Sequence, residues 1–124
     1  IHALETVYPI VGPGFESIQN IGDKNRNIVH LHHSKGIDIN IANIHDMLGG
    51  FGLISLMGTK GGIQIKSTDT YYAFKKQLQS YVNYLQTGHK PVPWNETYEL
   101  MQLVSAGIES REKGGIKITL NKDN

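Results

Sequence analysis

Histidine is the side chain in this sequence best suited to acid–base chemistry or metal binding near neutral pH. The six histidines include His2 close to the first residue and a group of three, His30, His32 and His33. An imidazole titrates near neutrality, so it can take a proton from an alcohol and release it again. The chain has no cysteine, which excludes disulfides, zinc–thiolate sites and thiol catalysis. The candidate chemistry therefore depends on imidazoles.

His30 and His32 are two residues apart in a segment with the pattern of a β-strand, so both should lie on one face and His33 on the other. Such a pair binds a metal ion when a third ligand converges on it, and Asp38 or His45 would be that ligand. No acidic cluster accompanies the pair, so we favour a polar sheet face with hydrogen-bonded imidazoles. His30 and His32 are also our candidates for binding a hydroxyl-rich substrate.

Two segments are rich in glycine, as phosphate-binding loops are. Neither Gly12-Pro13-Gly14 nor Gly49-Gly50-Phe51-Gly52 fits G-x-G-x-x-G between a strand and a helix, and no segment fits the P-loop pattern. We interpret these glycines as turns and close-packing points. The sequence thus predicts no cofactor-binding and no metal-binding residues, and this chain alone should not bind a dinucleotide.

The elements that position these residues follow from the spacing of apolar side chains. Helical spacing over His2–Val11 ends at Gly12-Pro13-Gly14, and Pro9 predicts that this helix is short or bent. Alternation with a period of two then predicts five strands joined by short turns, and short turns imply antiparallel neighbours. The predicted strands are Phe15–Ile21, Ile28–His33, Ile37–Ile44, Phe51–Met57 and Ile63–Lys66.

Two longer amphipathic helices and a last strand complete the pattern. The first is capped by Asp69 or Thr70 and ends at Gly88, and the second begins near Asn95 and ends at Gly114-Gly115. Gly107 inside the second helix predicts close packing against a neighbouring element. With a final strand over Ile116–Leu120, the fold class is α+β: an open, mainly antiparallel β-sheet with helices packed on one face.

The faces of the predicted strands differ in polarity. In the third strand Ile37, Ile39 and Ile41 share one face while Asp38 and Asn40 share the other, which is typical of a sheet with one packed and one polar face. The fourth strand is apolar on both faces, so we expect helices to cover one side and a partner subunit or domain the other.

Composition narrows the class of protein. The 124 residues, 39% hydrophobic and 19% charged, form one ordinary globular domain over residues 1–124. The net charge is only +1 and the basic residues are scattered, which weighs against nucleic acid as a partner. No apolar run reaches the roughly 20 residues needed to cross a bilayer, so we expect no membrane association. The lack of cysteine fits a cytoplasmic location.

Three segments carry a resemblance to a known family. His2-Ala3-Leu4-Glu5 through Gly12-Pro13-Gly14 resembles the start of the C-terminal domain of the Gfo/Idh/MocA oxidoreductases, the relatives of glucose–fructose oxidoreductase and inositol dehydrogenase. Phe74 to Pro93 is similar to that family's long helix and its Pro-rich exit. Glu96 to Gly115 is similar to its closing helix. The similarity spans nearly the whole chain.

The resemblance implies a function for the parent protein. It implies an NAD- or NADP-dependent oxidoreductase acting on a sugar, polyol or related hydroxy compound, whose N-terminal Rossmann domain would precede Ile1. It places His2 on the family's catalytic histidine, which helps to remove the proton of the substrate hydroxyl, and Glu5 where the family often has Asp. This chain would then be the substrate-binding half and would build a homo-oligomer through its sheet face.

Two other functions stay open from the sequence. A non-enzymatic binding or regulatory relative of the same fold would keep these elements and lose the chemistry. A metal-binding domain built on His30 and His32 is the third possibility.

Overall fold

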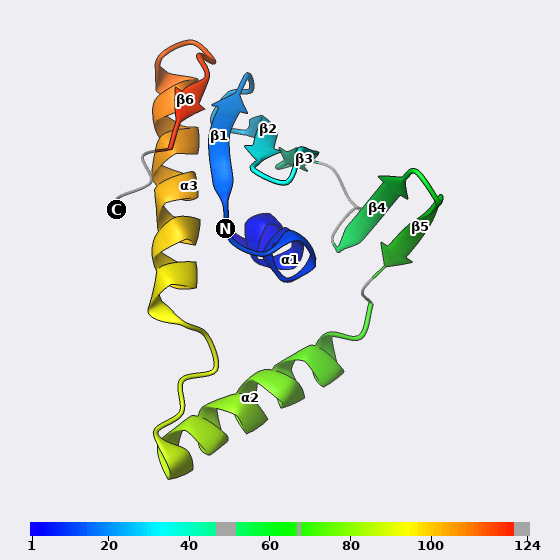
Figure 1. Ribbon diagram of the computed structural model, residues 1–124, viewed down its shortest axis with the longest axis vertical. Helices are drawn as coiled ribbons and strands as arrows, with labels where there is room; N and C mark the ends of the chain where they lie inside the picture. Colours follow the sequence, from blue (N-terminus) through cyan, green and yellow to red (C-terminus); the bar gives the residue numbers. More distant parts are fainter. Residues whose placement is uncertain (47–51, 67, 121–124) are drawn as a thin grey trace. The chain divides into compact units, whose positions relative to one another are not determined.

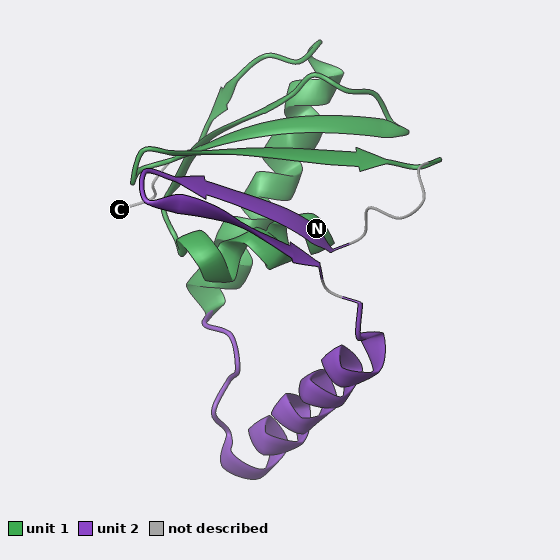
Figure 2. Ribbon diagram, turned by 90° about the vertical axis from the view of Figure 1, so that its right-hand side faces the viewer, with its two compact units in different colours: residues 1–47, 94–124 green, residues 48–93 purple. Residues whose placement is uncertain are grey.

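The computed structural model describes residues 1–46, 52–66 and 68–120, which form an α+β protein (Figure 1). By contact, the chain forms two compact units, residues 1–47 with 94–124 (unit 1) and residues 48–93 (unit 2) (Figure 2). Unit 1 contains α1 (His2–Val11), β1 (Phe15–Asn20), β2 (Arg26–His33), β3 (Ile37–Ile44), α3 (Trp94–Glu112) and β6 (Ile118–Thr119). Unit 2 contains β4 (Leu53–Gly58), β5 (Gly61–Lys66) and α2 (Thr70–Thr87).

The strands of unit 1 form one open antiparallel sheet in the order β3-β2-β1-β6. The predicted tight turn at Ser34-Lys35-Gly36 joins β2 to β3, and Gly36 takes the left-handed conformation (φ 72°) that such a turn favours. The short final strand β6 returns to pair with β1 on its other side. The α+β class and the open antiparallel sheet predicted from the sequence are thus confirmed.

Alternation along β2 and β3 separates a packed face from an open one. Leu31 pairs with Ile39, and Val29 pairs with Ile41, on the face that carries the core. His30 pairs with Asn40, and His32 with Asp38, on the opposite face. The polarity of the two faces of β3 is therefore as predicted.

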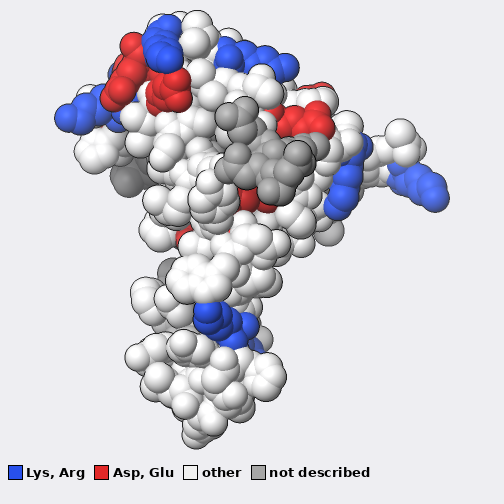
Figure 3. Space-filling model, turned by 60° about the vertical axis from the view of Figure 1, so that its left-hand side comes forward, with Lys and Arg blue, Asp and Glu red and all other residues white. Residues whose placement is uncertain are grey.

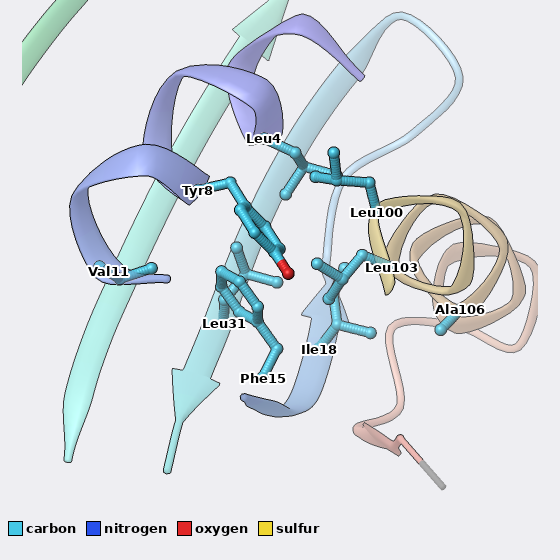
Figure 4. Packing of buried hydrophobic residues seen from close by; sticks show 9 residues of the cluster. All are labelled: Leu4, Tyr8, Val11, Phe15, Ile18, Leu31, Leu100, Leu103 and Ala106. Atoms are coloured by element: carbon cyan, nitrogen blue, oxygen red, sulfur yellow. The ribbon is translucent and has the colours of Figure 1, made fainter. Parts of the chain in front are cut away.

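Two helices cover the packed face (Figure 4). α3 lies against β1 and β6, and α1 lies against β3. Leu31 from β2 and Leu103 from α3 are fully buried at the centre, and truncating a leucine of this kind to alanine costs about 2–5 kcal/mol. The cluster consists of Leu4, Tyr8, Val11, Phe15, Ile18, Leu31, Leu100, Leu103 and Ala106.

Gly107 lets α3 approach β1 closely, as its position inside a helix predicted. A Cβ at this position would lie 3.1 Å from Cδ1 of Ile18. Replacing Gly107 with valine should therefore lower the free energy of unfolding by about 2 kcal/mol, because the Cβ alone already crowds Ile18 and the two methyl groups add further bulk. Urea unfolding measures the change. Ser105→Val, at an exposed position of the same helix, controls for the helix propensity of valine, and equal losses in the two variants would contradict the packing argument.

Ser110 fixes the end of α3 nearest β6. Its hydroxyl is fully buried, accepts a hydrogen bond from the backbone N–H of Asn20 (2.9 Å) and donates one to the carbonyl of Ile116. The hydroxyl thus both accepts and donates a hydrogen bond, which offsets the cost of burying a polar group in the core. α3 thus has a fixed register along β1.

Unit 2 is a β-hairpin followed by a helix. β4 and β5 pair antiparallel as a two-stranded sheet of their own. Asp69 caps α2 by accepting a hydrogen bond from the backbone N–H of Tyr72 (2.8 Å), and Gly88 ends the helix in the left-handed conformation. The cap and the end of this helix are as predicted. Phe51, predicted as the start of the fourth strand, and Gly49-Gly50 lie outside the described residues.

The apolar side chains of unit 2 are more exposed than the sequence predicted. No residue of α2 is buried, and its stripe of Tyr71, Phe74 and Leu78 is more than half exposed. In β4, for which we expected helices on one face and a partner subunit or domain on the other, Met57 is 92% exposed. A hairpin and one helix hold too few apolar groups to bury each other's faces. On the side shown in Figure 3, the surface over α2 is largely uncharged, with a small basic patch.

No helix among the described residues combines the length and apolarity needed to cross a membrane.

Candidate functional site

His2 begins α1 and presents its imidazole to solvent. The side chain is 80% exposed, and its Nδ1 lies 3.0 Å from Oε2 of Glu5 one turn later. Residues three apart share a helix face, so this contact follows from the spacing alone. A carboxylate can only accept a hydrogen bond, so it favours the tautomer with the proton on Nδ1. Nε2 is then left with its lone pair directed outward, able to accept a proton.

Glu99 anchors the helix that carries His2. Its Oε2 accepts a hydrogen bond from the Tyr8 hydroxyl (2.7 Å), and its Oε1 accepts hydrogen bonds from the backbone N–H groups of Gly14 and Phe15 (2.8 Å each). One carboxylate of α3 thus holds α1 and the start of β1 together. This role of Glu99 was not predicted, because Tyr8 and Gly14 lie 91 and 85 positions away in the chain.

Tyr8 is a hydrogen-bond donor here and not an acid–base catalyst. Burial holds the pKa of its hydroxyl well above the ordinary value of 10.0, and the hydrogen bond and charge of Glu99, with the charge of Glu96, raise it further. The phenol therefore keeps its proton at neutral pH and donates it to Glu99. This leaves His2 as the acid–base candidate on α1.

A second polar group lies on the open face of the sheet, as the sequence predicted. Nδ1 of His30 lies 3.0 Å from Oδ1 of Asn40, and Nδ1 of His32 lies 2.8 Å from Oδ1 of Asp38. Nε2 of His30 lies 3.5 Å from that same Asp38 oxygen. The two imidazoles therefore share one carboxylate, and we call His30, His32, Asp38 and Asn40 the sheet-face cluster.

The charge of Asp38 is stabilised within this cluster. The hydrogen bond from His32 holds the pKa of the Asp38 carboxyl below its ordinary value, against the opposing effect of desolvation, and the charges of His32, His30 and Lys117 add to the lowering. Asp38 is therefore an ionised carboxylate at neutral pH.

His33 has a structural role. It is fully buried on the packed face, where Nδ1 accepts a hydrogen bond from the backbone N–H of Lys35 (3.1 Å) and Nε2 lies 3.0 Å from the carbonyl oxygen of Pro13. Its ring packs edge-on against Phe15. Both nitrogens are occupied, so His33 is not available to a substrate.

The histidines do not form a metal centre in the described part of the chain. No group of three or more His, Asp or Glu side chains there is arranged to hold a metal ion. In the sheet-face cluster the Asp38 oxygen is already hydrogen-bonded to Nδ1 of His32, so this nitrogen and oxygen face each other and not a common ion.

The structure separates the two sets of predicted site residues. α1, with His2, packs on the covered face of the sheet, whereas His30 and His32 lie on the open face. The two sets therefore lie on opposite sides of the sheet in unit 1. The substrate-binding role of His30 and His32 stays a prediction, and the geometry does not bring them to His2.

The described cavities do not contain the candidate catalytic residues. A shallow groove of about 470 Å³ runs along α2, lined by residues that include Tyr71, Phe74 and Leu78. Its lining holds no histidine, aspartate or glutamate, so it offers no general base of the kind found on α1.

The glycines of unit 1 do not form a dinucleotide site. Gly12-Pro13-Gly14 joins helix α1 to strand β1, whereas the pyrophosphate fingerprint joins a strand to the N-terminus of a helix. Gly12-Pro13-Gly14 therefore does not have the topology of that fingerprint. Comparison of the chain with protein-family models, with curated proteins and with solved structures found no match in any of the three.

Proposed function

We propose that this chain is the substrate-binding and oligomerisation domain of an NAD(P)-dependent oxidoreductase that acts on a sugar, polyol or related hydroxy compound. The observation that carries the proposal is the exposed imidazole of His2, whose Nδ1 is held by Glu5 at 3.0 Å. The sequence resemblance to the Gfo/Idh/MocA oxidoreductases places a catalytic histidine at this position. The α+β architecture with an open antiparallel sheet is consistent with that resemblance.

In the proposed reaction, this chain would carry out the proton transfer. Oxidation of an alcohol to a carbonyl removes a hydride from carbon and a proton from oxygen. Nε2 of His2 would accept the hydroxyl proton, while Glu5 keeps the imidazole in the required tautomer. A positioned general base of this kind contributes about 10²- to 10⁴-fold in rate. The hydride acceptor would be bound by a separate nucleotide-binding domain.

The fold supports this role by fixing α1. Leu4 and Tyr8 pack into the core, and Tyr8 donates its hydrogen bond to Glu99 of α3. α1 is thus packed into unit 1 although the His2 side chain is exposed. A catalytic group held by a well-packed element keeps its reacting atom in place.

The open face of the sheet is the surface we assign to assembly with a second copy of the chain. Ile28 is 38% exposed there, beside the hydrogen-bonded sheet-face cluster. A mixture of apolar contacts and satisfied polar groups is typical of protein–protein interfaces.

A nucleotide titration tests whether this chain binds NAD(P)H without another domain. Adding NADH or NADPH to the 124-residue chain should give no saturable fluorescence change in the micromolar range, because the chain has no pyrophosphate-binding loop. A dehydrogenase with a complete Rossmann domain, titrated in the same buffer, verifies the assay. Micromolar binding by the isolated chain would contradict the proposal that a separate domain binds the nucleotide.

A further inference from the structure

The apolar side chains of α2 follow a regular spacing along the helix. Successive intervals of three and four residues separate Tyr71, Phe74, Leu78, Tyr81 and Leu85, and Val82 adds to the same side. This is the spacing with which an α-helix packs lengthwise against another helix, because it keeps one apolar line facing the neighbour. We call these six residues the α2 seam.

The α2 seam exposes enough surface for a stable interface. Each of its residues is between 48% and 78% exposed, and no residue of α2 is buried against the described part of the chain. At about 200 Å² for a large apolar side chain in the open, the seam exposes on the order of 700 Å². An interface of standard size buries about 800 Å² on each partner, so the seam with its polar edges supplies the area that one dimer needs.

The arrangement of the seam is symmetric about Leu78. Tyr71 and Leu85 lie seven residues before and after it, and Phe74 and Val82 lie four residues before and after it. A second copy turned end for end about Leu78 therefore meets apolar positions with apolar positions. An interface between identical copies related by a two-fold axis requires this match of a surface with itself. The symmetry points to a second copy of the chain as the partner.

The charges of unit 2 permit this pairing. α2 carries two charged side chains, Lys75 and Lys76, and Lys76 lies about 160° around the helix from Leu78. In an antiparallel pair the two copies of Lys75 are about 9 Å apart along the axis, so they do not face each other. Unit 2 as a whole carries five lysines and one aspartate. The two copies therefore repel weakly, and association should strengthen as salt screens this charge.

We propose that this chain dimerises through α2, with the α2 seams of two copies packed antiparallel and Leu78 of both copies at the two-fold axis. The antiparallel direction also places the opposite ends of the two helix dipoles side by side. This dimer does not depend on the proposed oxidoreductase function, and it uses a different surface from the open face of the sheet.

The lack of cysteine in the chain permits a test by cross-linking. Leu78→Cys should form a disulfide with its own copy on oxidation, because facing Cα atoms of two packed helices come within the roughly 7 Å that a disulfide spans. Leu85→Cys alone should not, because its two copies would be about 20 Å apart. Leu85→Cys mixed with Tyr71→Cys before oxidation should give the mixed dimer, which intact-protein mass spectrometry identifies.

Sedimentation equilibrium over a concentration series measures the association constant. Leu78→Lys should lower this constant at least about 100-fold, because each copy loses its central apolar contact and two ammonium groups face each other. Ala73→Lys adds the same charge at an exposed position on the other side of the helix and should change the constant less than about threefold. Far-UV circular dichroism verifies that both variants remain folded.

Two results would overturn the proposal. A wild-type chain that is monomeric over the whole concentration series would show that the α2 seam belongs to another part of the protein or to a different partner. A dimer that Leu78→Lys leaves intact, and that Leu78→Cys does not cross-link, would show that another surface, such as the open face of the sheet, forms the interface.

Discussion

Replacing Glu99 with alanine should lower the free energy of unfolding by about 3–5 kcal/mol, a large part of the total for a domain of this size. The glutamate accepts three hydrogen bonds, one from the Tyr8 hydroxyl and two from the backbone N–H groups of Gly14 and Phe15. Alanine leaves all three donors without an acceptor in a partly buried place, and each orphaned group costs about 1–3 kcal/mol. Urea unfolding followed by far-UV circular dichroism measures the loss.

Glu99→Gln is the matched control for this prediction. Its amide oxygen can still accept from the backbone N–H groups of Gly14 and Phe15, while its amide nitrogen can donate to the Tyr8 oxygen. The charge is lost but the hydrogen bonds can be kept, so about 1–2 kcal/mol should be lost. If glutamine and alanine were equally destabilising, the charge of Glu99 would be the main contribution and our account of three orphaned donors would be wrong.

The second large effect is expected on catalysis. Under the proposed function, His2→Asn in a polypeptide that joins this chain to a nucleotide-binding domain should lower kcat about 10²- to 10⁴-fold, because asparagine cannot accept the hydroxyl proton. The side chain of His2 is 80% exposed, so stability should change by less than about 0.5 kcal/mol. Reduction of NAD or NADP, measured by absorbance with a panel of sugars and polyols, gives the rate.

The control for His2 is another exposed histidine. His89→Asn lies in the segment between α2 and α3 and should leave both rate and stability unchanged. If His2→Asn kept wild-type activity on every substrate that the unaltered enzyme oxidises, His2 would not be the proton acceptor. The proposed enzymatic role would then lose its main support, and a non-enzymatic binding domain would be the better hypothesis.

The parts of the fold with strong local patterns could be predicted from the sequence. Alternation in Ile37–Ile44 identified the packed and open faces of β3, because neighbouring side chains of a strand point to opposite sides. Asp69 and Gly88 marked the limits of α2 for equally local reasons, a side-chain cap and a left-handed end. These features depend on residues close together in the chain.

Features that depend on distant residues were missed. The hydrogen bonds of Glu99 reach Gly14 and Tyr8, which are 85 and 91 positions away, and no periodicity marks such a partner. The separation of the strands into a four-stranded and a two-stranded sheet also has no local signal, because β4 alternates like a strand in either arrangement. The exposure of α2 was missed because an apolar stripe predicts that a helix is amphipathic but not which surface covers it.

The candidate site, too, could be predicted only where its contacts are local in the sequence. The spacing of His30 and His32 predicted that they share a face, and the register confirms it. Their common partner Asp38 was placed on the polar face and considered as a metal ligand, but its hydrogen bond with His32 was not predicted, because the pairing across the turn had to be known first. The contact between His2 and Glu5 is local, yet its importance came only through the resemblance.

Unit 1 is built from two stretches of chain that flank unit 2, and this has a consequence for biosynthesis. Leu31 and Leu103 meet at the centre of the core, so the ribosome must complete α3 before the core can close. Until then the nascent strands β1 to β3 expose their apolar face, and exposed apolar surface of this kind is prone to aggregation. We therefore expect this core to form late and after translation, at the millisecond-to-second rates of folds with many long-range contacts.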